Sequence, residues 1–253
     1  MNKVAGAMGR RAAALTAAGA LSACAPAAGP RTESVAVPFV GCAADGQVGP
    51  VDAPASGIAP SVPPDVAPQL AYYASEHAGV LAPRGWQCFA LIGSNGSFLA
   101  VAPRPLASDD LLGEPHPLKG PAVLYSRSDG GTSGRWAAVE AAARYFPERR
   151  GLIDRLHGMD LLPEGLRNRP YPADRIRRLD SNTIAFTTPP GARGEGTEGR
   201  LGPTRDSVEG LVILVPAGED FPDTVEVEVR LPDRRERLAQ AILGEVRTRS
   251  VGK

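Results

Sequence analysis

The sequence lacks an excess of charge of either sign. It holds 28 lysines and arginines against 28 aspartates and glutamates, so its formal net charge is zero. Loss of residues 1–23, which contain Lys3, Arg10 and Arg11 and no acid, would leave the remainder slightly acidic. A nucleic-acid-binding domain normally shows a basic excess or a basic stripe. We therefore expect no nucleic-acid partner.

Metal-binding and cofactor motifs are also missing. None of the three histidines, His77, His116 and His157, has a second histidine at ligand spacing, and there is no H-E-x-x-H motif. One acidic stretch does contain a histidine, and its members are Asp109, Asp110, Glu114 and His116. We favour a solvated loop there, with a divalent-cation site as the alternative. The sequence thus predicts no metal ion and no cofactor.

The patterns that would mark a catalytic nucleophile are weak. A serine hydrolase carries G-x-S-x-G at a strand-to-helix turn. Residues 131–135 have the wrong spacing, and residues 93–97 lie in an expected hairpin turn. The run Gly130–Arg135 could hold an anion at the start of a helix. Because it lacks the Lys-Ser/Thr ending of a phosphate-binding loop, we favour simple capping of the helix by Ser133. No catalytic residue is assigned.

Aromatic residues are scarce, at 5% of the chain, whereas glycine and proline are plentiful, at 29 and 25 residues. This composition predicts long loops. Apolar residues make up 43% and charged residues 22%, which is typical of a globular protein. A chain of 253 residues can bury a sizeable core. We expect one domain over residues 39–250.

The N-terminus has the features of an export signal. Three basic residues precede a short apolar run, Ala12–Ala20, which is too short to span a bilayer. Leu21–Cys24 resembles the bacterial lipobox, which implies cleavage before Cys24 and attachment of lipid to that cysteine. We expect a signal peptide over 1–23 and a flexible tether over 24–38. An ordinary secretory signal is the alternative.

The lipobox resemblance implies where the protein resides. Several acyl chains on Cys24 would anchor it firmly to the membrane, facing the periplasm. Residue 25 is alanine and not aspartate, which favours the outer over the inner membrane by analogy with enteric lipoprotein sorting. The expected partners are the membrane and, in addition, an envelope protein.

Cysteine is the next scarce residue, with three in the chain. Once Cys24 carries lipid, only Cys42 and Cys88 remain. An oxidising compartment and an even number of thiols favour a disulfide between them. Closing this loop would stabilise the fold by roughly 4 kcal/mol on the chain-entropy model. Two free buried cysteines are the main alternative, and a redox-active or metal-binding pair is a lesser one.

The clearest structural signal is a hairpin within Val80–Pro103. Asn95-Gly96 is typical of a two-residue type I′ turn. Pairing outward from it places Ile92 opposite Leu99 and Cys88 opposite Pro103. Both faces of this hairpin are apolar. We therefore expect both to be covered by other parts of the fold.

The remaining elements predict an α+β fold, mainly an antiparallel sheet with flanking helices and a C-terminal helix. Thr224–Leu231 alternates valine with charged residues, so we expect one face of that strand to be wet. A capping pattern at Asp233 and Glu236 predicts the last helix. Other helices are expected at 69–76, at 149–157 and from Ser133 to Phe146, with Trp136, Val139, Ala143 and Phe146 on one buried face. Other strands are expected at 122–126, 183–188 and 210–215.

One long segment, Pro189–Asp206, is rich in glycine and charge. Loops of this length are usually functional or disordered. We favour disorder, with a ligand lid as the alternative.

Two further motifs carry a family resemblance. Phe39–Pro50 (FVGCxxDGQxGP) and Ala82–Cys88 (APRGWxC) resemble a family of uncharacterised exported bacterial proteins. That resemblance implies a single domain and supplies no active site. The sequence therefore predicts a lipid-anchored envelope protein, either a non-catalytic binding or envelope-maintenance module or, alternatively, a hydrolase with its site near residues 191–206.

Overall fold

A computed structural model describes residues 33–47, 49–112, 118–216, 220–232 and 235–251. They belong to one compact unit, Glu33–Lys253. The expected signal peptide and the lipidation residue Cys24 lie outside the described residues. The first strand, β1 (Val35–Ala36), pairs with β5 (Ser61–Val62), so part of the expected tether takes part in the fold. Within the described residues, no helix combines the length and apolarity needed to cross a membrane.

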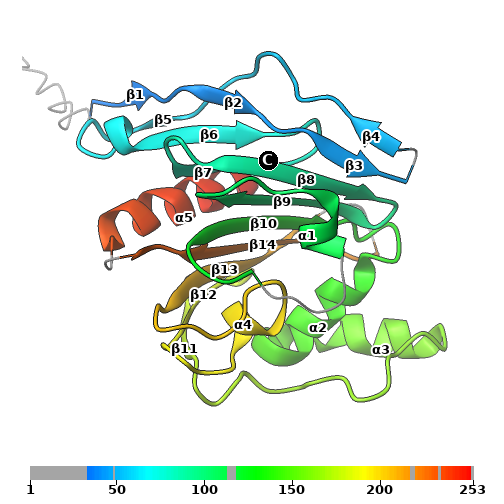
Figure 1. Ribbon diagram of the computed structural model, residues 1–253. Coiled ribbons are helices and arrows are strands. Elements are labelled where there is room, and N and C mark those ends of the chain that lie inside the picture. The colour runs from blue at the N-terminus through cyan, green and yellow to red at the C-terminus, as the bar shows by residue number, and fades with distance from the viewer. Residues whose placement is uncertain (1–32, 48, 113–117, 217–219, 233–234, 252–253) are drawn as a thin grey trace, which may run out of the picture. The chain divides into compact units, whose positions relative to one another are not determined.

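The main element is a nine-stranded sheet, shown in Figure 1. In spatial order its strands are β11 (Arg175–Arg178), β12 (Thr183–Thr188), β13 (Val208–Val215), β14 (Asp223–Arg230), β10 (Ala122–Ser128), β9 (Gly96–Ala102), β8 (Gln87–Gly93), β3 (Ala44–Gly46) and β4 (Gly49–Val51). All neighbours are antiparallel except β3 and β8. The strands expected at 122–126, 183–188 and 210–215 are confirmed.

Helices lie around this sheet. They are α1 (Ser108–Leu112), α2 (Arg135–Tyr145), α3 (Arg150–Gly158), α4 (Glu195–Glu198) and α5 (Glu236–Val251), with 3-10 turns at Ala67–Gln69 and Pro147–Arg149. The C-terminal helix and the mainly antiparallel sheet confirm the predicted α+β class. Asp233, part of the expected capping pattern of α5, lies outside the described residues.

A second, three-stranded sheet is formed by β2 (Phe39–Gly41), β6 (Leu70–Ala74) and β7 (Gly79–Pro83). The helix expected over 69–76 is therefore wrong. Tyr72 and Tyr73 favour a strand, and pairing with β7 buries Leu70 and Tyr73 completely. The Tyr73 hydroxyl donates to the Pro83 carbonyl oxygen at 2.8 Å, which satisfies its polar end inside the core.

The β8–β9 hairpin is confirmed, but its turn lies one residue earlier than expected. Gly93 pairs with Gly96, so the loop is Ser94-Asn95, and Cys88 pairs with Val101 and not with Pro103. Among the described non-glycine residues only Asp160 has a positive φ, so Asn95 does not adopt a type I′ turn. Gly96 has a φ of +141°, and a Cβ there would lie 1.9 Å from the Arg127 carbonyl oxygen. This close strand approach explains the glycine.

The register error leaves the two faces of the hairpin unchanged. The pairing differs by two residues, and side chains alternate with a period of two. Ala90 and Leu99 pack in the core on one side of the sheet, while Phe89, Leu91 and Phe98 pack against the core on the other. The prediction that both faces are covered is confirmed for the first face and only in part for the second, where Phe89, Leu91 and Phe98 are half-buried.

A disulfide joins Cys42 and Cys88, as expected, with a Cα–Cα distance of 5.4 Å. Cys42 follows β2 of the small sheet, and Cys88 lies in β8 of the large sheet. Cys42 is also part of the apolar core between the two sheets. The covalent link therefore holds the small sheet against one face of the large one.

Most of that face of the large sheet is covered. The three-stranded sheet covers β9 and β10, and α5 packs on β13, β14 and β7 (Figure 1). Helix α5 contributes Leu238, Ile242 and Val246, the stripe that the sequence predicts. The valines of β14, Val225, Val227 and Val229, point into the same core.

The opposite face is covered over only part of its width. Helix α2 packs on β14, β10 and β13, and α4 packs on β12 and β13. The predicted buried face of α2 is partly wrong. Val139 and Phe146 are buried, but Trp136 is 41% exposed, and its indole nitrogen donates to the Leu161 carbonyl oxygen. The buried side of α2 carries alanines and Tyr145 because the helix lies close to the sheet.

Two smaller expectations about helices have different outcomes. Ser133 does not cap α2, which begins after Gly134 with no side-chain cap. Helix α3 is confirmed, and Leu152, Ile153 and Leu156 form a small satellite cluster with Val139 and Phe221.

Candidate functional site

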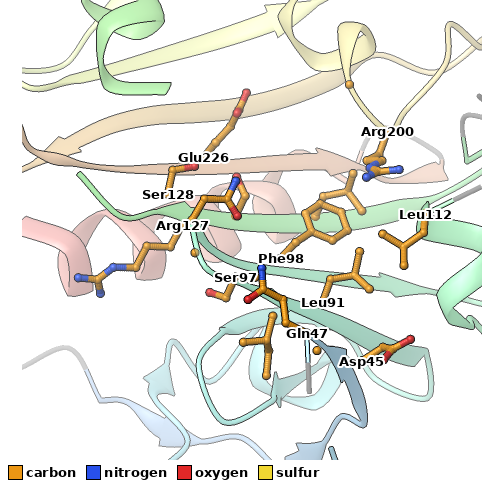
Figure 2. Close-up of a pocket in the computed structure, with 18 of the residues that line it drawn as sticks. Asp45, Gln47, Leu91, Ser97, Phe98, Leu112, Arg127, Ser128, Arg200 and Glu226 are labelled. Atoms are coloured by element: carbon orange, nitrogen blue, oxygen red, sulfur yellow. The ribbon is translucent and has the colours of Figure 1, made fainter. Parts of the chain in front are cut away.

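The sheet face beside α2 contains a groove of about 580 Å³, drawn in Figure 2. Its floor is the exposed part of β8, β9 and β10, and it reaches β14 at one end. Residues from the β3–β4 region, α1 and the segment after α4 complete its rim. The lining residues are Asp45, Gly46, Gln47, Leu91, Ile92, Gly93, Asn95, Gly96, Ser97, Phe98, Leu112, Leu124, Ser126, Arg127, Ser128, Gly199, Arg200, Glu226 and Glu228.

One row of paired residues runs across the groove floor. Strand register places Asp45 beside Leu91, Leu91 beside Phe98, Phe98 beside Ser126 and Ser126 beside Glu226. Because paired residues in neighbouring strands point to the same face, these five side chains form a line across the sheet. The line is apolar in the middle and carboxylic at both ends. Figure 2 shows Asp45 and Glu226 at opposite ends.

The rim near α1 is held by polar contacts. The Ser108 hydroxyl donates to Asp45 at 2.8 Å, which fixes the start of α1 over β3. At the other end of that helix, Leu112 is 60% exposed at the groove edge. The Arg200 guanidinium lies 5.9 Å from the centre of the Phe98 ring. The groove therefore has an apolar floor with both an aliphatic and a cationic edge.

Two glutamates of β14, Glu226 and Glu228, form the inner end of the groove. Burial, and secondarily the charge of Glu195, raise the pKa of Glu226 to about 8. Burial also raises the pKa of Glu228, and the charge of Glu226 adds to this effect. Glu228 is only 8% exposed, and its Oε2 has no hydrogen-bond partner among the described residues. The expectation of a wet face on this strand is wrong, because α2, α4 and neighbouring loops cover it.

Behind these glutamates lies a buried ion pair. Arg144 of α2 donates from Nη1 to both carboxylate oxygens of Glu195 at 2.9 Å, and the Tyr145 hydroxyl donates to the same carboxylate. Burial and the negative charge of Glu195 raise the pKa of Tyr145 far above its usual range. Tyr145 therefore remains a hydrogen-bond donor, and the pair fixes α4 to α2.

The segment Pro189–Asp206 is folded onto the sheet, contrary to the expectation of disorder. The Glu195 amide donates to Asp174, and the Gly196 amide donates to the Thr188 hydroxyl, so two partners outside α4 hold its first turn. A Cβ at Gly196 would lie 2.5 Å from Val208 Cγ1, so the close packing of this turn against β13 requires glycine. The segment thereby delivers Gly199 and Arg200 to the groove rim.

Arg230, the last residue of β14, lies on the same face of the sheet as Glu226 and Glu228. It is fully buried and donates to the carbonyl oxygens of Leu118, Gly120 and Gly202. These bonds replace the water that a charged side chain needs, and they tie two loops to the sheet. The residue is therefore explained by structure.

The side chains weighed as sites from sequence lie elsewhere. His77 and His157 do not line the groove, and Glu114 and His116 lie outside the described residues. Asp110 pairs with Arg104 and accepts from the Ala107 amide. In the Gly130–Arg135 run, the amides of Gly130 and Gly131 donate to Asp223 and Asp129, so these two amides already have carboxylate partners. Among the described residues, no group of three or more histidine, cysteine or acidic side chains is arranged to hold a metal ion.

Sequence reasoning missed the glutamates of β14. The available signal was the position of Thr224–Leu231 directly after the buried strand Gly210–Val215. Two acids alternating with valines in such a strand can lie over a solvated face or in a covered polar site, and only the covering helices distinguish these cases.

A second hollow lies between α5 and the β11–β13 edge of the sheet. Its charges are balanced. The bases are Arg175, Arg205 and Arg235, and the acids are Asp206, Glu209 and Glu236. It therefore shows no preference for a charged ligand.

Comparisons with protein-family models, with curated proteins and with solved structures find no match to this chain. The family resemblance of the FVGC and APRGW motifs stays a prediction.

Proposed function

We propose that this protein is a lipid-anchored binding module of the bacterial cell envelope, and that the groove on the β8–β9–β10 face binds the apolar part of an amphipathic ligand. The groove carries the proposal. It has the size of a small-molecule site, a mainly apolar floor and a few converging polar groups, which is the usual composition of ligand pockets.

The placement of apolar side chains supports binding more than simple packing. Leu91 and Phe98 lie only half-buried on the groove floor, although Ala100 and Leu124 on the same face are almost completely buried. Leu112 adds an exposed aliphatic side chain at the edge. A contiguous apolar surface with a polar rim is typical of an interaction site.

Crosslinking in living cells tests this proposal. A photoreactive phenylalanine analogue replaces Leu112, and the matched control carries it at Ile58, which is 96% exposed and does not line the groove. We expect position 112 alone to give an adduct with the mass of a small amphipathic molecule, and Phe98→Ala to reduce it. Equal adduct yields at both positions would contradict the proposal.

The anchor is tested separately. Cys24→Ala should abolish the lipid mass increment and release the protein from membranes after cell disruption. If the variant stays with the membrane and keeps the wild-type mass, the lipoprotein hypothesis is wrong. This result does not depend on the groove.

A hydrolase is the second candidate, because Glu226 and Glu228 lie close together in a groove rimmed by Gly199 and Arg200 of the 191–206 segment. Paired carboxylates in different environments can act as general acid and base. Incubation of purified protein with envelope extract should then yield cleavage products that Glu226→Gln and Glu228→Gln both abolish. Unchanged products with both variants would remove this candidate.

A further inference from the structure

We propose that the groove selects ligands that carry an ammonium group next to an apolar moiety, and that Glu226 and Glu228 hold this ammonium. The inference deepens the proposed binding function and depends on it. It is carried by the geometry of the groove and by an unpartnered carboxylate at its inner end.

The groove floor suits a molecule with one apolar and one cationic end. Phe98 and Leu91 supply the apolar surface, Ser126 follows as the next side chain in the same row, and Glu226 ends it. A ligand lying along this row would place its polar group at the two glutamates. Figure 2 shows Glu226 beyond Phe98 at the end away from Asp45.

The inner end has more acids than bases. The acids there are Glu226 and Glu228 themselves together with Glu140 and Glu195, whose charges act on them, and the bases that act on them are Arg144 and Arg230. Arg144 is engaged by Glu195 and Glu140, and Arg230 by three backbone carbonyl oxygens. Among the described residues, neither base forms an ion pair with the β14 glutamates, and a ligand cation could supply one.

The unpartnered carboxylate of Glu228 provides a second, independent observation in favour of a cationic ligand. It is more than nine-tenths buried and lines the groove, and its Oε2 has no hydrogen-bond partner among the described residues. A buried carboxylate oxygen without a donor is costly. An ammonium group has several N–H donors and a positive charge, so it can satisfy both glutamates at once.

The other charged residues of the lining do not favour an anion at this end. The Arg127 side chain is directed away from the floor in Figure 2 and pairs with Asp223. Arg200 lies over Phe98 at the rim. An anionic group at the inner end would instead meet Glu226 and Glu228.

Proton release should accompany binding. The groups that face Glu226 are Glu228 on its own strand, Glu195 on α4, and Arg144 and Glu140 on α2. Burial among acids favours the protonated form of Glu226, and an arriving cation favours the ionised form. Binding of a cation should therefore strengthen as the pH rises through the range in which Glu226 ionises.

The test uses two probes of matched shape, 2-phenylethylammonium and 2-phenylethanol. The mature lipidated chain is held in lipid nanodiscs, with empty nanodiscs as the background. We expect the ammonium to bind about 10-fold more tightly than the alcohol near pH 8.5, and this ratio to fall towards one near pH 5.5. Glu226→Gln and Glu228→Gln should each reduce the ratio at high pH, while Glu148→Gln, outside the groove, should not.

The outcomes separate this inference from the proposed function. Equal binding of both probes, unchanged in the Gln variants, would overturn ammonium recognition and leave the apolar groove intact. Binding of neither probe, together with no adduct at position 112, would overturn both. Because glutamine has the shape of a protonated glutamate, the variants should fold, and thermal unfolding verifies this.

Discussion

The two faces of β14 have the same strand geometry and opposite surroundings. Val225, Val227 and Val229 enter a sealed core formed with α5 and the small sheet. Glu226, Glu228 and Arg230 point the other way, into a polar layer beneath α2 and α4 and beside the groove. The comparison shows that alternation along a strand divides its residues between faces but does not decide which face meets water.

The difference lies in what covers each face. An apolar face needs only apolar contacts, and α5 supplies them without directional partners. The glutamate face requires donors, and Arg144 and Tyr145 bond to Glu195 while Glu228 Oε2 has no partner among the described residues. The sealed face therefore stabilises the fold, and the polar face is the one suited to bind a ligand.

The largest expected effect concerns the sealed face. Replacing Cys42 and Cys88 together by serine should lower the free energy of unfolding by about 4 kcal/mol, because the disulfide restricts a long loop in the unfolded chain. Urea unfolding measures the change. Reduction of the wild-type protein should produce the same shift, and an unchanged midpoint would contradict the role of the disulfide.

The next effect is on the polar face. Glu195→Ala leaves the buried Arg144 guanidinium without its main partner and should lower the free energy of unfolding by about 3 kcal/mol. The matched control is Glu198→Ala on the same helix, whose partner Arg193 is exposed, and its effect should be much smaller. Similar losses for both variants would show that the buried pair has no special contribution.

The smallest effect is a pH dependence. The pKa of Glu226 is raised from its ordinary value of 4.5 to about 8, so the folded state binds more protons than the unfolded state between these limits. Stability should therefore fall as the pH rises through this window and then level off. Glu226→Gln should reduce that fall, with the remainder due to Glu228, and should stabilise the protein by about 2 kcal/mol above the window, a figure that allows for solvent screening.

Thermal unfolding at a series of pH values measures this change. The control is Glu148→Gln, because a hydrogen bond from Arg178 lowers the pKa of Glu148. In the wild type this bond stabilises the fold above the acid range and is lost as the pH falls, so Glu148→Gln should change the slope of stability against pH only in the acid range and leave the slope through the Glu226 window unchanged. Parallel profiles for wild type and Glu226→Gln would contradict burial of the Glu226 charge.

Several elements were predictable because local pattern and tertiary setting agree. Thr183–Thr188 is a strand with the predicted bounds, and Leu238, Ile242 and Val246 form the buried stripe of α5. The disulfide followed from the number of cysteines and the expected compartment. Prediction failed at Leu70–Ala74, where a helix was expected although Tyr72 and Tyr73 favour a strand, and where pairing with the distant β7 forms β6.

By itself, the sequence determined the class of the fold, the cysteine pair and the two faces of β8, β9 and β14, because side-chain alternation and turn residues are local properties. Tertiary structure alone decided that Pro189–Asp206 folds against α2 and that two β14 glutamates end a groove. These outcomes depend on contacts between residues far apart in the chain, such as Arg144 with Glu195. The free energy of a buried charge is set by all the groups around it, and no local pattern contains that information.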